Sequence, residues 1–288
     1  MEKLLVATYD QDLLQFEMFC YCINKNWKGN RFLTIVLNSS ADWDITRWRV
    51  NDIVDRYLCG WHAEIVDGRH LDHDGYREQA VNKIIFSIDD RFNDTIVFDS
   101  KDFLLRGSDL FDFKKDGKYR VTFTLDRPHL DLYPEAKDLL DKDISHIPAV
   151  LNLTPWIWNI DQLKKYWNYM SGRFGDFSDW DSMFKGGTES DTYYVYTFCD
   201  ELTSIKFLDP RDNPLMIGGG WTYQTYEGIV QEAQDFDRWS ERKIWKHSRK
   251  LEDPRCLNVT RSVLLKYGIE REIIDRVFGR QGTPGESS

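Results

Sequence analysis

The stretch Ile96-Val97-Phe98-Asp99-Ser100-Lys101-Asp102 joins an apolar run to a polar turn, and a second apolar run begins at Phe103. Short apolar runs that are bounded by turn residues are typical of buried strands. We therefore predict a strand over residues 95–98 that ends on Asp99. The turn after this strand would present acidic side chains at the carboxyl end of the strand.

The residues before this stretch alternate between strand-like and helix-like patterns. Strands are predicted over 4–8, 32–37 and 63–66, and helices over 13–23, 43–58 and 75–89. This order predicts an α/β fold with a mostly parallel sheet that is flanked by helices on both faces. Ligands of such sheets bind at the carboxyl ends of the strands. Thr8, Tyr9, Asp10 and Asp99 are expected at that edge.

The second half of the chain is less regular. We predict strands over 119–125 and 147–153, helices over 134–140, 160–170 and 189–202, two further helices after Pro254 and Gly268, and a loop over 171–177 because of its glycines. We interpret the chain as one domain: a donor-binding half over 1–126 and an acceptor half with helical C-terminal part over 127–278. The Gly/Pro/Ser-rich tail over 279–288 is expected to be disordered.

The composition narrows the function classes. The chain has 288 residues with 41% hydrophobic residues, enough for a sizeable core, and its net charge of -10 argues against a generally cationic nucleic-acid binder. The five cysteines form no CxxC pair, which favours reduced thiols. No run approaches the roughly 18 apolar residues of a bilayer span, and no signal peptide is apparent. We expect a cytoplasmic protein.

Positive charge gathers near the C-terminus. Residues 238–280 hold 12 Lys/Arg against 6 Asp/Glu, so this stretch carries about +6 on an otherwise acidic chain. It could face phosphate, DNA or anionic lipid. Solvated helix faces explain the same pattern equally well.

The turn at Asp99-Ser100-Lys101-Asp102 resembles the DxD-type motif of GT-A-type glycosyltransferases, and in particular of small bacterial and phage nucleotide-sugar transferases. The resemblance implies a GT-A, Rossmann-like fold and a divalent cation, Mn or Mg, that Asp99 and Asp102 ligate and that holds the donor diphosphate. It places Ser100 and Lys101 beside the donor. The motif departs from the family pattern because Lys101 stands at the third position. Lys101 could instead neutralise the diphosphate directly as a point charge.

A polar helix face precedes the acidic strand. The segment Gly75-Tyr76-Arg77-Glu78-Gln79-Ala80-Val81-Asn82-Lys83 is similar to the aromatic-x-x-Gln-x-x-x-Lys helix of the same enzymes, and Gln79 and Lys83 share one helical face. The resemblance implies donor contacts for Arg77, Gln79 and Lys83, and it places Thr8, Tyr9 and Asp10 near the nucleotide base. An exposed polar helix face is the alternative.

Two later segments complete the resemblance. It implies an acceptor wall at Thr154-Pro155-Trp156 and an acidic residue four positions before Tyr193, which also faces the acceptor; either Glu189 or Asp191 would then be the general base. Acids at a helix N-terminus also stabilise the helix dipole, which leaves both readings open. The resemblance further implies that His247 returns to the cation or diphosphate.

These patterns favour a glycosyltransferase, hexosyl or pentosyl, that moves a sugar from a nucleotide-sugar donor to a hydroxyl acceptor. The acceptor would be a surface glycan or a hydroxymethylated pyrimidine of phage DNA. A metal-dependent phosphohydrolase is the alternative enzyme class, because His70-Leu71-Asp72-His73-Asp74 concentrates ligand types. A non-catalytic carbohydrate- or DNA-binding protein is the third possibility.

Overall fold

The structure is a computed structural model of the chain. It describes residues 1–38, 43–68, 75–120, 123–128, 131, 134, 136–150, 154–175, 189–200, 206–207, 217–218, 226–238, 243–246 and 253–279.

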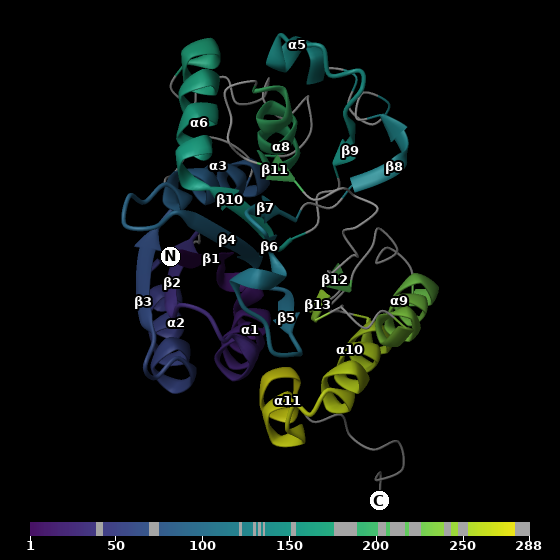
Figure 1. The fold of residues 1–288 in the computed structure, drawn as a ribbon. Coiled ribbons are helices and arrows are strands. Elements are labelled where there is room, and N and C mark those ends of the chain that lie inside the picture. Colours follow the sequence, from purple (N-terminus) through teal and green to yellow (C-terminus); the bar gives the residue numbers. More distant parts are fainter. Residues whose placement is uncertain are drawn as a thin grey trace, which may run out of the picture.

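The central sheet has five strands in the order β10-β4-β1-β2-β3 (Figure 1). These strands are β1 (Glu2–Thr8), β2 (Phe32–Leu37), β3 (His62–Asp67), β4 (Asp94–Asp99) and β10 (Trp156–Asn159). The first four are parallel, and β10 adds an antiparallel edge to β4. The predicted parallel sheet is confirmed. The edge strand β10 was not predicted.

Helices cover both faces of the sheet (Figure 1). They are α1 (Leu13–Asn26), α2 (Trp43–Tyr57), α3 (Gly75–Ser87), α5 (Ala136–Leu140), α6 (Ile160–Phe174), α8 (Glu189–Cys199), α9 (Tyr226–Arg238), α10 (Pro254–Lys266) and α11 (Arg271–Phe278). Side chains of β1 alternate between two cores, because successive residues of a strand point to opposite faces. Leu4 and Val6 pack with α1 and α2, whereas Leu5 and Ala7 pack with α3, α6 and α8.

The shorter strands form smaller sheets beside the central one. They are β5 (Asp102–Leu104), β6 (Lys114–Lys115), β7 (Lys118–Tyr119), β8 (Phe123–Pro128), β9 (Pro148–Val150), β11 (Lys206–Phe207), β12 (Ile217–Gly218) and β13 (Ile244–Lys246). The strand β13 pairs antiparallel with β5 and parallel with β12. This pairing places β13, from the C-terminal part of the chain, beside β5, which begins directly after the turn that ends β4.

One prediction for the second half needs correction, and one helix there was not predicted. The loop predicted over 171–177 begins later, because α6 continues through Phe174 and ends at Gly175, whose φ of 75° suits glycine. Gly172 lies inside the helix with open space around its Cα. Helix α9 was not predicted, whereas α10 and α11 follow Pro254 and Gly268 as expected. Among the described helices, none is both long and apolar enough to cross a bilayer.

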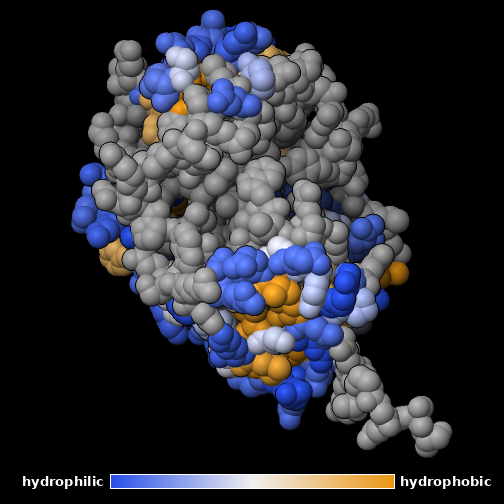
Figure 2. Space-filling view, turned by 90° about the vertical axis from the view of Figure 1, so that its right-hand side faces the viewer, coloured by the Kyte–Doolittle hydropathy of each residue, from blue (hydrophilic) through white to orange (hydrophobic). Residues whose placement is uncertain are grey.

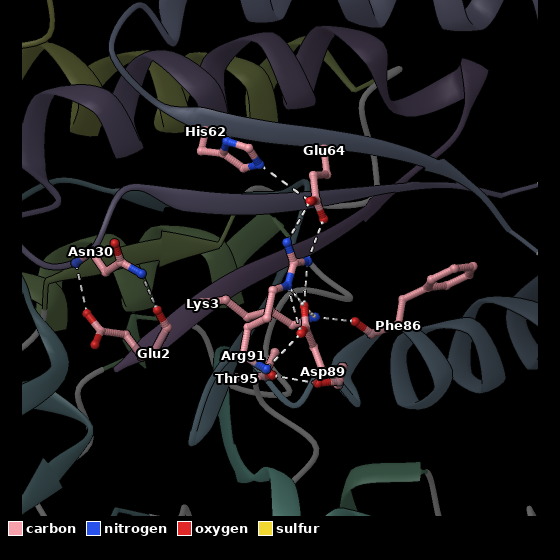
Figure 3. A network of polar contacts seen from close by, with 10 residues as sticks. Glu2, Lys3, Asn30, His62, Glu64, Phe86, Asp89, Arg91 and Thr95 are labelled. Atoms are coloured by element: carbon pink, nitrogen blue, oxygen red, sulfur yellow. Dashed lines mark hydrogen bonds and ion pairs between the residues drawn. The ribbon is translucent and has the colours of Figure 1, made fainter.

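An ion-pair network ties β1 and β3 to the turn before β4 (Figure 3). The guanidinium of Arg91 donates to both oxygens of Asp89 and to both oxygens of Glu64. The buried ammonium of Lys3 lies 3.4 Å from Asp89 and donates to the carbonyl of Phe86 at 2.6 Å. Hydrogen bonds from Arg91 lower the pKa of Asp89 from 3.8 to about 2.

Replacing Asp89 by Asn is therefore expected to lower the free energy of unfolding near neutral pH by about 1–2 kcal/mol. The pKa of Asp89 is lower in the folded state than in the unfolded state. Its contribution to the free energy of unfolding is therefore present above pH 3.8 and is lost as the pH falls towards about 2. Urea unfolding of both proteins across this range measures the effect. Asp90→Asn, at a neighbouring and exposed acid, is the control. A difference between wild type and Asp89→Asn that stays constant down to about pH 2 contradicts the assignment.

Candidate active site

The carboxyl ends of β1 and β4 lie side by side, because Ala7 is the register partner of Asp99. Asp99 ends β4 with about a fifth of its side chain exposed. The sequence predicted an acid at this edge of the sheet, and the structure places it there.

Two lysines from distant segments hold Asp99. The ammonium of Lys83, on α3, donates to Oδ1 at 2.9 Å, and that of Lys246, on β13, donates to Oδ2 at 2.5 Å. Thr154, just before β10, donates to the same Oδ2 at 3.3 Å and accepts from Lys246 at 2.5 Å. The Asp99 carboxylate thus contacts Lys83, which was predicted to bind the sugar donor, and Thr154, which was predicted to bind the sugar acceptor. Lys246 is its third partner.

Sequence reasoning missed Lys246. The β5–β13 register sets Lys246 opposite Asp102 and Trp245 opposite Phe103. Trp245 is fully buried and anchors the strand, while Lys246 reaches the end of β4. The only local signal is the apolar pair Ile244-Trp245 before this lysine, which does not reveal its partner strand.

Asp102 closes the turn rather than facing solvent. Its side chain is fully buried, its Oδ2 accepts from the backbone N–H of Asp99 at 2.8 Å, and its Oδ1 lies 3.4 Å from Lys246. Burial raises the pKa of Asp102. Burial also acts to raise the pKa of Asp99, but Lys246 and Lys83 outweigh it and hold that pKa well below its usual range. The surroundings of Asp99 therefore favour its ionised form, whereas burial favours the neutral form of Asp102.

Asp12 holds the middle of the same turn. It lies in the short 3-10 helix after β1, and its Oδ2 accepts from Lys101 at 2.6 Å and from Ser100 at 3.1 Å. Lys101 also lies 5.6 Å from the ring centre of Tyr9. Sequence reasoning chose Asp10, which is exposed, and passed over Asp12, which is buried. We call the following residues the Asp99 cluster: Asp12, Lys83, Asp99, Ser100, Lys101, Asp102, Thr154 and Lys246.

The Asp99 cluster does not fit the divalent cation that the resemblance implies. A hard cation needs several oxygen ligands, but both oxygens of Asp99 are bound by ammonium groups and Asp102 is buried. At about 4 Å and an effective dielectric of about 20, a dication repels each ammonium by roughly 8 kcal/mol. Among the described residues, no group of three or more His, Cys, Asp or Glu could hold a metal ion. His247 lies outside the described residues.

The other residues that were predicted to bind the sugar donor differ in how far they are buried. Thr8 is fully buried, and Gln79 is half-buried on α3. The side chain of Arg77 lies outside the described residues. Asn82, one residue before Lys83 within α3, donates to Asn38, directly after β2, at 3.1 Å. Asn82 and Asn38 are a further polar pair at the strand ends that the sequence did not single out.

The predicted acceptor residues divide into two groups. Thr154, Pro155 and Trp156 are buried beside Asp99, and Lys83 lies 4.8 Å from the ring centre of Trp156. Tyr193 lies in the core on α8, where its hydroxyl accepts from the backbone N–H of Asn159. This position favours a packing role for Tyr193.

Two further sets of predicted residues cannot be placed by their side chains. Glu189 and Asp191 lie in α8, but their side chains are outside the described residues. The segment 70–74, on which the phosphohydrolase alternative rests, is outside them as well.

Part of the basic C-terminal stretch is paired with acids of the same chain. Five of its described side chains form ion pairs with acids: Lys243 with Asp112, Lys246 with Asp99, Arg255 with Asp253, Arg261 with Asp275 and Arg276 with Glu17. These pairs favour a structural role for much of the positive charge.

A groove of about 560 Å³ lies between α9 and α10, and none of its described lining residues belongs to the Asp99 cluster. The face that carries these helices shows an apolar patch within hydrophilic surroundings (Figure 2).

Comparisons with known proteins support the architecture. No protein-family profile and no curated protein matches the sequence. The apo structure of the bifunctional glycosyltransferase WbbM is similar over 95% of this chain, with a TM-score of 0.50 and 11% identity, and the chain spans about half (51%) of that protein's length. The galactosyltransferase LgtC, in complex with donor and acceptor sugar analogs, has a TM-score of 0.49 and 11% identity over 96% of this chain and 100% of its own. GlyE of Streptococcus pneumoniae has a TM-score of 0.47 and 9% identity, covering 96% of this chain and 63% of its own. With its mostly parallel sheet flanked by helices, the chain has a GT-A-type glycosyltransferase fold.

Proposed function

We propose that the protein is a glycosyltransferase that moves a sugar from a nucleotide-sugar donor to a hydroxyl acceptor. The observation that carries this proposal is the Asp99 cluster at the carboxyl edge of the parallel sheet, where α/β proteins bind their ligands. The cluster gathers three lysines, and ammonium groups are suited to phosphate oxygens.

The reaction needs charge stabilisation on the leaving group and a base for the acceptor. When the bond between sugar and diphosphate breaks, negative charge develops on the departing nucleotide, and fixed cations nearby stabilise it. Glu189 or Asp191 on α8 would accept the proton of the acceptor hydroxyl. Thr154, Pro155 and Trp156 would form the wall on which the acceptor rests.

The acceptor in this proposal is a glycan hydroxyl, supplied with a hexose or a pentose. Five of the 12 Lys/Arg side chains of residues 238–280 are paired within the chain, three of them with acids outside this stretch, which weakens the support for a duplex-DNA acceptor.

Thermal unfolding in the presence of a panel of nucleotide-sugars tests the proposal. Ligand at about 100 times its Kd stabilises a protein by roughly 2.7 kcal/mol, which corresponds to about 5–10 °C in Tm for a chain of this size. We expect one nucleotide-sugar to give such a shift and to be turned over with a sugar acceptor. The absence of any shift, together with rapid hydrolysis of plain phosphate esters, would favour a phosphohydrolase.

A further inference from the structure

The three lysines of the Asp99 cluster contact its acids in two groups. Lys83 and Lys246 share the single carboxylate of Asp99, and Lys101 pairs with Asp12. The remaining acid, Asp102, is fully buried, and burial favours its neutral form. The carboxylate of Asp99 thus holds two ammonium groups at the strand end, and Lys246 also lies 3.4 Å from Asp102.

The acids also fix where these ammonium groups lie. Asp99 holds Lys83 and Lys246 on its two different oxygens, and Thr154 accepts from Lys246 as well. Asp12 holds Lys101 and Ser100 together on one oxygen. The cluster is therefore arranged before any ligand arrives, which reduces the entropy that binding must spend on ordering long side chains.

The exposure of the lysines differs in a way that assigns their roles. The side chains of Lys246 and Lys101 are 15% and 12% exposed, whereas that of Lys83 is 5% exposed. Lys246 and Lys101 are thus the cations that a ligand reaches first. Lys83 lies deeper, 4.8 Å from the ring centre of Trp156, and shares the carboxylate of Asp99 with Lys246.

We propose that Lys246 and Lys101, supported by Lys83, hold the donor diphosphate in place of a divalent cation, and that donor binding is independent of metal. This inference rests on the proposed glycosyltransferase function, because it concerns the donor of that reaction. Each ammonium offers three N–H donors to phosphate oxygens. In this arrangement Asp99 positions lysines and is not a metal ligand.

Calorimetric titration of nucleoside diphosphates into the protein tests the inference. The probes are UDP, GDP, CDP, ADP and TDP, each titrated in EDTA and again in Mn²⁺. We expect one of them to bind with a Kd that changes less than about threefold between the two conditions. Lys246→Ala and Lys101→Ala are expected to weaken this binding at least tenfold in EDTA, and Lys246→Arg, which keeps the charge, to weaken it less.

Lys243→Ala is the matched control, because Lys243 lies just before the same strand and pairs with an acid outside the cluster. It should leave the Kd within about twofold of wild type, and thermal unfolding of every variant checks its fold.

The outcomes separate the two proposals. Binding that requires Mn²⁺, or that survives both lysine replacements, overturns the metal-independent site while leaving the glycosyltransferase function in place. If no nucleoside diphosphate binds in either condition, the proposed function itself is overturned.

Discussion

Replacing Asp99 by Asn is expected to lower sugar transfer by a factor on the order of 10²–10³, comparable to the loss of one preorganised electrostatic group in other active sites. The amide keeps the shape of the carboxylate but removes the charge that Lys83 and Lys246 share. Without that charge the two ammonium groups repel each other and leave their positions. The measurement is kcat/KM for transfer with the donor that the thermal panel identifies.

Loss of fold must be distinguished from loss of chemistry, because removing one partner of a buried ion pair also destabilises a protein. Asp112→Asn is the matched control: Asp112 is exposed to nearly the same extent as Asp99 and also pairs with a lysine, Lys243, outside the cluster. We expect Asp112→Asn to lower Tm but to transfer sugar at the wild-type rate. Full activity in folded Asp99→Asn would remove the central role given to this residue.

Replacing Trp158 by Ala is expected to lower the free energy of unfolding by about 3–5 kcal/mol, the usual cost of deleting a large buried aromatic side chain. Trp158 is fully buried in β10, stacks on Trp156 at 5.6 Å between ring centres and packs against Tyr193 at 5.8 Å. Its loss leaves a cavity between the sheet and α8. Urea unfolding followed by circular dichroism measures the change.

Trp158→Phe provides the comparison. Among the described residues, the indole N–H of Trp158 has no hydrogen-bond partner, so phenylalanine keeps much of the packing and removes an unpaired donor. We expect it to lose far less stability than alanine does. Equal losses for the two variants would contradict the packing role of this ring.

The parallel part of the sheet could be predicted because its signals are local. Each of β1, β2 and β4 is a short run of apolar residues buried on both faces, and each is followed by an amphipathic helix or a turn. The position of Asp99 at the end of β4 follows from this order alone. The side chains of Lys83, a predicted donor-binding residue, and Thr154, a predicted acceptor-binding residue, both contact Asp99, and their roles stay predictions.

The contact between Asp99 and Lys246 could not be predicted from the sequence. Strand β13 has three residues, and nothing in Ile244-Trp245-Lys246 specifies that it pairs with β5 rather than with another edge. Asp12 was missed for a different reason: Asp10 and Asp12 are both polar residues after a strand, and only the fold buries the second. The edge strand β10 likewise depends on tertiary pairing rather than on its own propensity.

The pairing of β13 with β5 also fixes when, during synthesis of the chain, the Asp99 cluster can form. Asp99 and Lys246 are 147 residues apart, so at about 5–20 residues per second the ribosome releases the carboxylate roughly 7–30 s before its second lysine. By then β1, β2, β3 and β4 have all been synthesised and can pair. A nascent chain can thus complete its parallel sheet before Lys246 exists. The Asp99 cluster is complete only after residues 244–246 have been synthesised and β13 has paired with β5.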